Sequence, residues 1–381
     1  MATNRDLNAA KVGKSDEFWT TYETINAEMQ AYLELNKNVF RDKTVLCPCD
    51  DPEYSNFTKW FVVHFQEIGL KRLICTSYAA HCKQYIYHQT SLFEQKSPQY
   101  NPAISELRGK VFIMDRSDDA PDMSSLKWSY LDGTGDYASD EVTALRDEAD
   151  IICTNPPFSI WSAFIRWILD SGKNFSIIGN INAVTYKDVF PAFRDGKMWL
   201  GASIHSGDRR FFVPDDYPMT AAGCGIDEDG RHYVRVKGVR WFTDIDYKQR
   251  HETLQLMTMA DNIKYSKHRE ILGKGYCKYV NFDAIDVPYT DAIPSDYEGV
   301  LGVPISFIDK WSPDQFELLG TADYTEGAES LGFAPIGDEW VTLYRSQGGR
   351  GHVTAGMKQP ALIDHDGKAG IAFKRIFIKK R

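Results

Sequence analysis

The residues best suited to chemistry in this 381-residue chain are Asn155, Pro156, Pro157 and Phe158. Two consecutive prolines remove two backbone donors and fix two φ angles, so they make a stiff turn that presents an amide, backbone carbonyls and an aromatic face. The Asn155 side-chain oxygen and the Pro156 carbonyl could accept both hydrogens of an amine attached to a heteroaromatic ring, while Phe158 stacks on that ring. This arrangement favours a more tetrahedral nitrogen and predicts methyl transfer to it without a covalent enzyme intermediate.

The same tetrapeptide has a simpler interpretation as a rigid turn after a strand, because a four-residue match is short. Its position favours the catalytic interpretation: it follows an apolar strand, and Ser159 opens a helix directly after it. A base inside a duplex could not reach such a turn, so a nucleic-acid base would be flipped out at a cost of roughly a few kcal/mol.

Alternating strands and helices must position this turn. Strands are expected at 44–49, 71–76, 110–115, 150–154 and 175–179, and helices at 15–36, 55–68, 159–172 and 186–194. This alternation predicts an α/β fold with an open, mostly parallel sheet and helices on both faces. Ligands bind at the carboxyl ends of the strands in such sheets, which is where the 155–158 turn lies.

Beyond Gly201 the pattern becomes irregular and rich in glycine. We therefore expect residues 1–200 to form the catalytic domain and residues 201–320 a second region that reads the substrate. Residues 321–381 are expected to form a loop-rich insertion, up to residue 372, and a final strand at 371–378. Residues 88–109 are expected to form a long loop.

Composition excludes several classes of protein. Charged residues make up 25% of the chain, and no apolar run approaches the ~20 residues of a membrane span. Residues 1–14 lack the apolar core of a secretion signal, so we expect a cytoplasmic protein with no membrane partner. The seven cysteines are odd in number and are expected to be reduced thiols. The spacing of Cys75, His81, Cys82 and His88 fits no zinc site, and no metal is expected.

Charge is unevenly distributed along the chain. The net charge is −9, but residues 231–278 hold eleven Lys and Arg against five Asp and Glu. The last eight residues add five basic residues and no acid. An acidic body with confined basic zones can present one face to a polyanion, so this pattern permits nucleic-acid binding without proving it.

Asn-Pro-Pro-Phe is the catalytic motif of amino-group DNA methyltransferases, and the whole chain resembles the EcoRI-type adenine-N6 DNA methyltransferase family. The matching segments follow the order of that family: 14–18, 49–52, 55–57, 154–159, 185–187, 199–201, 296–297, 302–304 and 315–318. Segments 88–109 and 321–372 have no close counterpart in it.

The resemblance implies a Rossmann-like class I fold, S-adenosylmethionine (SAM) as methyl donor, and site-specific methylation of a flipped-out adenine in double-stranded DNA, as in restriction-modification. No obligate protein partner is expected. The resemblance places cofactor contacts at Asp16, Phe18, Trp19, Thr20, Cys49, Asp50, Asp51, Pro52, Asp136 and Tyr137. For DNA contact we select Lys264, Lys267 and Arg269 in the basic zone.

Several questions stay open at this point. Asp136 follows Gly133-Thr134-Gly135 and could equally belong to a surface turn. No acid follows the strand at 71–76, so the group that binds the SAM ribose is unassigned. Pro48-Cys49 resembles the nucleophile of cytosine-C5 methyltransferases, but it lies on the first strand and not on the catalytic loop, so we interpret Cys49 as a cofactor-pocket or packing residue. Cytosine-N4 methylation and a DNA-binding protein without catalysis are the alternative functions, and the loop also permits methylation of RNA or of protein glutamine.

Overall fold

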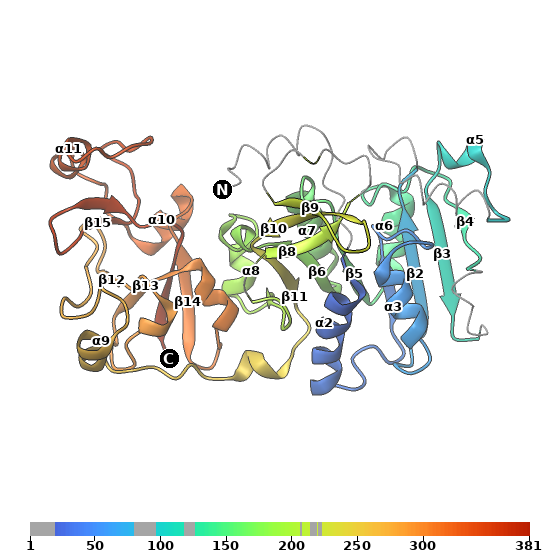
Figure 1. Cartoon of the computed structure of the whole chain (residues 1–381), viewed down its shortest axis with the longest axis horizontal. Helices are drawn as coiled ribbons and strands as arrows, with labels where there is room; N and C mark the ends of the chain where they lie inside the picture. Colours follow the sequence, from blue (N-terminus) through green and yellow to red (C-terminus); the bar gives the residue numbers. More distant parts are fainter. Residues whose placement is uncertain (1–19, 80–96, 118–125, 206–207, 214–218, 220–222) are drawn as a thin grey trace. The chain divides into compact units, whose positions relative to one another are not determined.

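The computed structural model describes residues 20–79, 97–117, 126–205, 208–213, 219 and 223–381 (Figure 1). In these ranges the larger sheet has eight strands, in the order β4-β3-β2-β1-β5-β6-β11-β7. They are β1 (Thr44–Cys47), β2 (Arg72–Ser77), β3 (Lys110–Asp115), β4 (Ser129–Tyr130), β5 (Ile151–Thr154), β6 (Asn174–Asn180), β7 (Trp199–Leu200) and β11 (Val239–Thr243). The helices of this part of the chain are α2 (Tyr22–Leu35), α3 (Asn56–His64), α5 (Pro102–Ser105), α6 (Asp140–Glu148) and α7 (Trp161–Ser171).

The centre of this sheet is parallel. Strand β1 runs parallel to β2 on one side and to β5 on the other, and β5 runs parallel to β6. Every residue of β1 and β5 is buried, as is typical of parallel strands covered on both faces. The predicted α/β class and the parallel centre of the sheet are therefore confirmed, and the carboxyl ends of β2, β1, β5 and β6 share one edge.

Strand β3 departs from the parallel centre of the sheet and runs antiparallel to β2. Its first residue, Lys110, pairs with Ser77, the last residue of β2. The chain therefore re-enters the sheet at the edge that it has just left, whereas a parallel strand needs a crossover back to the opposite edge. In the described part of this connection the only helix is the four-residue α5.

Helices cover both faces of the sheet. Side chains of successive strand residues point to opposite faces, and the neighbours Trp241 and Phe242 in β11 contact different helices. The Trp241 ring lies 5.8 Å from that of Phe57 in α3, and the Phe242 ring lies 4.8 Å from that of Trp161 in α7. Helices α3 and α7 therefore pack on opposite faces, as expected.

The ends of α3 and α7 follow local signals, whereas one expected helix differs. Ser55 caps α3 by accepting a hydrogen bond from the Phe57 amide at 3.0 Å, and Gly172, with φ of 65°, ends α7. The helix expected at 186–194 is shorter: a 3₁₀ helix, η3, spans Ile181–Thr185, and α8 spans Phe190–Arg194. Proline favours the first turn of a helix, so Pro191 marks the start of α8.

The chain divides into two compact units. Unit 1 contains residues 1–180 and 200–248, and unit 2 contains residues 181–199 and 249–381. Besides the large sheet, unit 1 includes a three-stranded sheet of β8 (Asp208–Phe212), β9 (Cys224–Ile226) and β10 (His232–Lys237). Strand β11 lies in the glycine-rich part of the sequence beyond Gly201. Because it pairs with β6 in the large sheet, residues 200–248 belong to unit 1.

Unit 2 is built on a second sheet, in the order β12-β13-β17-β14, with a separate hairpin of β15 and β16. The strands are β12 (Ala284–Asp286), β13 (Val300–Pro304), β14 (Phe316–Thr321), β15 (Ala361–Ile363), β16 (Ala369–Ile371) and β17 (Arg375–Lys380). Its helices are η3, α8, η4 (Lys248–His251), α9 (Met259–Tyr265), η5 (Thr290–Ala292), η6 (Ile305–Lys310), α10 (Thr325–Leu331) and α11 (Asp338–Ser346). Helix η4 crosses the unit boundary at its first residue.

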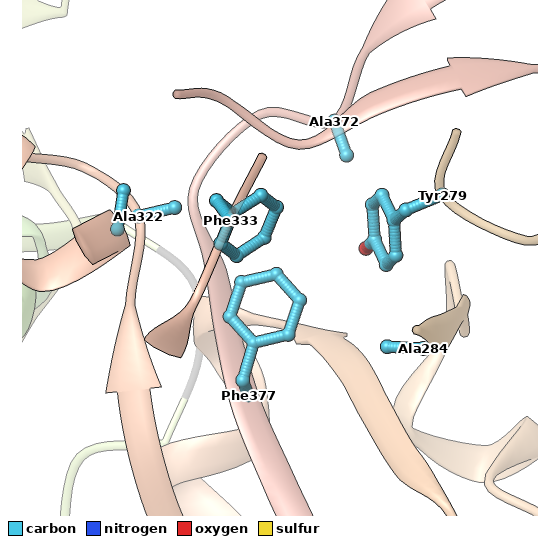
Figure 2. Packing of buried hydrophobic residues seen from close by; sticks show 7 residues of the cluster. Tyr279, Ala284, Ala322, Phe333, Ala372 and Phe377 are labelled. Atoms are coloured by element: carbon cyan, nitrogen blue, oxygen red, sulfur yellow. The ribbon is translucent and has the colours of Figure 1, made fainter. Parts of the chain in front are cut away.

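An aromatic cluster forms one core of unit 2, with the rings of Phe333, Phe377 and Tyr279 gathered beside small alanines (Figure 2). The Phe377 ring lies 5.2 Å from that of Phe333 and 5.5 Å from that of Tyr279, in edge-to-face contacts that favour close packing of aromatic side chains. The Tyr279 hydroxyl donates a hydrogen bond to Asp286 at 2.6 Å, and Arg375 forms an ion pair with the same carboxylate at 2.7 Å. This network fixes the start of β17.

The segment 321–372 is more regular than the loop-rich insertion that we expected, because it holds α10, α11 and the β15–β16 hairpin. The expected final strand, 371–378, is broken at Lys374, whose φ of 44° lies in the left-handed region. Such a backbone conformation cannot continue a strand, so β16 and β17 are separate strands.

Candidate functional site

The Asn155-Pro156-Pro157-Phe158 turn begins directly after β5, at the carboxyl edge of the parallel strands. Pro156 is buried, and Asn155, Pro157 and Phe158 are partly exposed. Backbone hydrogen bonds from the amides of Ile160 and Trp161 to the turn carry the chain into α7, which begins at Trp161, two residues after Ser159. The turn thus lies where the sequence predicts it, directly after a buried strand.

The turn after β1 lies beside the turn after β5 because the two strands are neighbours. The Asp50 carboxylate connects them: Ser55 donates a hydrogen bond to one of its oxygens and Thr154 to the other, each at 2.6 Å. Asp50 is 5% exposed. Burial, opposed in part by these hydrogen bonds, raises the pKa of Asp50 to about 7. A buried side chain thus links the residue before Asn155 to the cap of α3.

The rest of the first turn is held by a buried lysine. The Lys110 ammonium lies 2.6 Å from a carboxylate oxygen of Glu53 and 3.3 Å from one of Asp51, and its side chain is 4% exposed. It also lies over the rings of Trp128 and Tyr54, at 4.8 and 5.3 Å from their centroids. Burial raises the pKa of Glu53, and the lysine opposes this shift. Strand β3 thereby fixes the turn after β1.

The segment that contains Asp136 and Tyr137 approaches the end of β2. The Ala79 amide donates a hydrogen bond to the Thr134 carbonyl at 2.8 Å. Gly135, with φ of 81°, lies against Ser77 so closely that a Cβ atom there would be 2.3 Å from the Ser77 carbonyl oxygen. Only glycine allows both this φ and this approach.

Tyr78 interacts electrostatically with residues of two other turns. Burial raises the pKa of Tyr78, and the nearby Cys49 and Asp136 raise it further. Tyr137 has the same two neighbours, and its pKa is also raised, chiefly by burial. The Tyr137 ring packs at 4.9 Å from that of Phe164 in α7. Residues from after β1, after β2 and before α6 therefore form one cluster.

A sequence model of the family described as adenine-specific methyltransferase EcoRI matches residues 6–381. The type II methyltransferase M.EcoRI of Escherichia coli is 37% identical over 318 residues, which cover 84% of this chain and 89% of that protein. This chain belongs to the EcoRI adenine-specific methyltransferase family. M.MpnI of Mycoplasma pneumoniae is 29% identical over 315 residues, which cover 82% of this chain and 84% of that protein. No solved structure matches the chain. The resemblance seen in the sequence is thereby confirmed.

The structure describes most of the cofactor residues expected for an EcoRI-type methyltransferase. Asp16, Phe18 and Trp19 lie outside the described residues. Thr20 is buried, and its carbonyl accepts a hydrogen bond at 2.7 Å from Asn56, the first residue of α3. The chain before α2 therefore reaches the helix that follows the first turn.

The other expected cofactor residues of this family member differ in accessibility. Pro52 is buried, and Cys49 and Asp51 are partly exposed. The Asp136 side chain is exposed, and its carboxylate accepts a hydrogen bond from the Ala138 amide at 2.9 Å. This hydrogen bond within the segment is typical of the surface turn that the sequence also allowed. The carboxylate remains accessible to a ligand.

The expected DNA contacts of the EcoRI-type chain lie in unit 2. Lys264, Lys267 and Arg269 are all exposed. Lys267 forms an ion pair with Asp291 at 2.7 Å, and the Lys264 ammonium lies 4.9 Å from the Tyr265 ring centroid. Lys267 therefore already has an anionic partner, while Lys264 and Arg269 are the more accessible cations.

Sequence reasoning missed Tyr78, Lys110 and Thr154 as members of the site. Thr154 and Tyr78 lie next to strand ends, and that position could have indicated them. Lys110 gave no such signal, because its role depends on β3 entering the sheet at this edge.

The part of the chain that the structure describes holds no candidate metal site, since no group of three or more His, Cys, Asp or Glu side chains there could bind a metal ion. Cys75 is buried in β2, while His81, Cys82 and His88 lie outside the described ranges. No helix in those ranges is both long and apolar enough to cross a membrane.

Proposed function

We propose that this member of the EcoRI family transfers a methyl group from SAM to the N6 atom of an adenine flipped out of double-stranded DNA, as a site-specific modification enzyme. The observation that carries the proposal is the position of Asn155-Pro156-Pro157-Phe158 after β5, beside the turn after β1. The family match supports adenine as the target, and the relatives are type II methyltransferases.

The fold that we propose is the Rossmann-like class I methyltransferase fold. Four neighbouring parallel strands with helices on both faces support it, as does a ligand-binding edge at their carboxyl ends. We further propose that residues 201–320 supply most of the target recognition, with parts in both compact units.

The residues at this edge fit SAM. An exposed carboxylate at Asp136 beside the aromatic rings of Tyr137 and Tyr78 suits a purine and its sugar, and Cys49 lies close to both tyrosines. We assign the cofactor to these residues together with Asp16, Phe18, Trp19, Thr20, Asp50, Asp51 and Pro52. The buried Asp50 carboxylate is bonded within the protein, so its part is to hold the turn in shape. When bound, SAM supplies an electrophilic methyl group on a sulfonium sulfur.

The proposed catalytic turn acts by holding the target amine in the orientation that the reaction needs. The Asn155 side-chain oxygen and the Pro156 carbonyl accept the two amino hydrogens, which favours a tetrahedral nitrogen with an available lone pair. The two prolines keep these acceptors from moving, so no reorganisation is needed when the reaction occurs. Phe158 stacks on the flipped base and fixes the plane of its ring.

Replacing Asn155 with alanine tests this function. We expect Asn155→Ala to lower the rate of methyl transfer from labelled SAM to duplex DNA by about 10²–10³-fold, the usual effect of losing one preorganised polar group. SAM affinity should stay unchanged in a titration, because the side chain acts on the base. Asn38→Ala, at an exposed asparagine before β1, is the control and should keep full activity.

Three results would overturn the proposal. Full activity of Asn155→Ala would remove the catalytic role of the turn. Label found in cytosine would instead support N4 methylation, and wild-type protein that binds DNA without transferring label would support a binding protein without catalysis.

A further inference from the structure

The seven residues 347–353, after α11, form a tightly braced loop that we call the GGRG loop. Gly348 and Gly351 turn the chain with φ of 83° and 89°, values that L side chains rarely adopt. A Cβ atom on Gly349 would lie 2.4 Å from the Tyr344 ring, so the loop packs directly on that ring. Three glycines are thus needed to bring the loop back over its own helix.

The Arg345 guanidinium fixes the inner side of the loop. It donates hydrogen bonds to the carbonyls of Gly349, Gly351 and Val353, at 2.9, 2.8 and 3.0 Å. The Tyr344 hydroxyl donates a fourth bond, at 2.7 Å, to the carbonyl of Arg350. Four carbonyls of one short loop therefore have donors, which removes most of its acceptors from the surface.

The base of the loop is anchored in a second core of unit 2. Val353 is buried there with Trp340 and Ala361. The Tyr344 ring stacks on the Trp340 ring at 5.2 Å and 10°, and the Trp340 indole donates a hydrogen bond to Leu362 at 3.1 Å. The helix that carries Arg345 and the loop that it braces are thus parts of one packed structure.

The middle of the loop holds hydrogen-bond donors that have no acceptor within the described residues. Within the described residues, the backbone amides of Arg350, Gly351 and His352 donate to no acceptor, and the Arg350 side chain makes no hydrogen bond or ion pair. Both Arg350 and His352 are exposed. Successive free amides beside a guanidinium are a typical anion-binding arrangement.

The local charge of this segment also favours anion binding. Residues 345–358 contain Arg345, Arg350 and Lys358 and no Asp or Glu, in a chain whose net charge is −9. A segment without acids in an acidic protein is suited to a polyanion rather than to a basic partner. Preorganisation lowers the entropy lost on binding, so the bracing by Arg345 should increase affinity.

We propose that the GGRG loop contacts the phosphate backbone of the DNA substrate, with the Arg350 guanidinium and the adjacent amides as donors and Arg345 as the positioning residue. Backbone contacts of this kind fix the orientation of a protein on DNA without reading its sequence. The inference rests on the proposed function, because it takes duplex DNA as the substrate.

The test is the salt dependence of binding to a fluorescently labelled duplex, measured by anisotropy. A protein that neutralises one phosphate fewer should show a log–log slope reduced by about 0.9. We expect Arg350→Ala to show this change and to raise Kd severalfold, and Arg350→Lys to retain most of the slope. Arg41→Ala, at an exposed arginine before β1, is the control and should match wild type.

A double-mutant cycle separates contact from positioning. Arg345→Ala should weaken DNA binding, and Arg350→Ala should then have a smaller effect in that background than in wild type, because the loop no longer holds the guanidinium in place. A circular-dichroism spectrum and a cooperative thermal unfolding transition like those of wild-type protein would show that each variant is folded.

The outcomes distinguish this inference from the proposed function. If Arg350→Ala matches Arg41→Ala in slope and Kd, the loop contacts no DNA, although the protein can still be a methyltransferase. If wild-type protein binds no duplex at all, the proposed function fails as well. If inorganic phosphate, compared with chloride at equal ionic strength, binds only to protein with Arg350 while the DNA slope is unchanged, the loop is a free-anion site and the DNA contact is wrong.

Discussion

The turn after β1 and the GGRG loop after α11 are both polar, but they direct their hydrogen-bonding groups oppositely. At the first turn, the Asp50 carboxylate and the Lys110 ammonium are buried and bonded within the protein. At the loop, Arg345 occupies the carbonyls, while the Arg350 guanidinium is exposed. Groups that are bonded within the protein fix the geometry of the first turn, whereas the exposed donors of the loop are available to a ligand. The two regions should therefore respond differently to mutation: the first in stability, the second in salt-dependent binding.

The largest expected effect is at Lys110. Lys110→Ala removes the cation between Asp51 and Glu53 and leaves two partly buried carboxylates without it. Breaking a buried ion pair in this way costs about 3–5 kcal/mol of unfolding free energy, which urea denaturation can measure. Lys37→Ala, at an exposed lysine, is the control. Equal stability of the two variants would show that the first turn does not depend on inward bonding.

A smaller effect is expected in the pH dependence of stability. Burial raises the pKa of Asp50 from near 3.8 to about 7. The folded state therefore keeps a proton on Asp50 that the unfolded state releases. The contribution of this proton to the free energy of unfolding is complete below pH 4 and is lost as the pH rises through 7. Between pH 6 and 7 wild-type protein should lose about 1 kcal/mol of unfolding free energy, and Asp50→Asn should lose much less.

Asp244 provides the control for this pH experiment. Burial raises its pKa to about 6, so its contribution is mostly lost by that pH. Asp244→Asn should therefore keep the decrease between pH 6 and 7 that Asp50→Asn removes. If both variants lose stability as steeply as wild-type protein, Asp50 does not hold its proton in the folded state.

The smallest expected effect concerns the predicted DNA contacts in the basic zone. Joint replacement of Lys264, Lys267 and Arg269 with alanine should flatten the salt dependence of DNA binding, by about 0.9 in log–log slope for each phosphate that the protein no longer neutralises. Lys267 should contribute least, because Asp291 already neutralises it. A slope that stays at the wild-type value would place the DNA elsewhere on the protein.

The sequence predicted the position of the turn at Asn155 better than it predicted how the chain connects one strand to the next. The turn at Asn155, the strand before it and the cap at Ser55 follow from local signals: apolar runs, consecutive prolines and a capping serine. The direction of β3 does not, because it depends on the sheet edge at which the chain returns, which no local pattern of residues states.

Burial of polar groups was also beyond sequence reasoning. Asp50 reads as a surface or cofactor carboxylate until the Thr154 hydroxyl of a neighbouring strand is placed beside it. Similarly, the glycines of residues 348–351 suggested a loose loop, whereas the guanidinium of Arg345 and the ring of Tyr344 brace them. Such contacts arise only when distant segments meet.

The identity of the methylated base tests the proposed function most directly. Duplex DNA incubated with the protein and SAM would be digested to nucleosides and analysed by mass spectrometry. We predict N6-methyldeoxyadenosine as the product, formed about 10²–10³-fold more slowly when Asn155 is replaced with alanine. N4-methyldeoxycytidine as the only modified nucleoside, or N6-methyldeoxyadenosine at the wild-type rate from the alanine variant, would contradict the role assigned to the turn after β5.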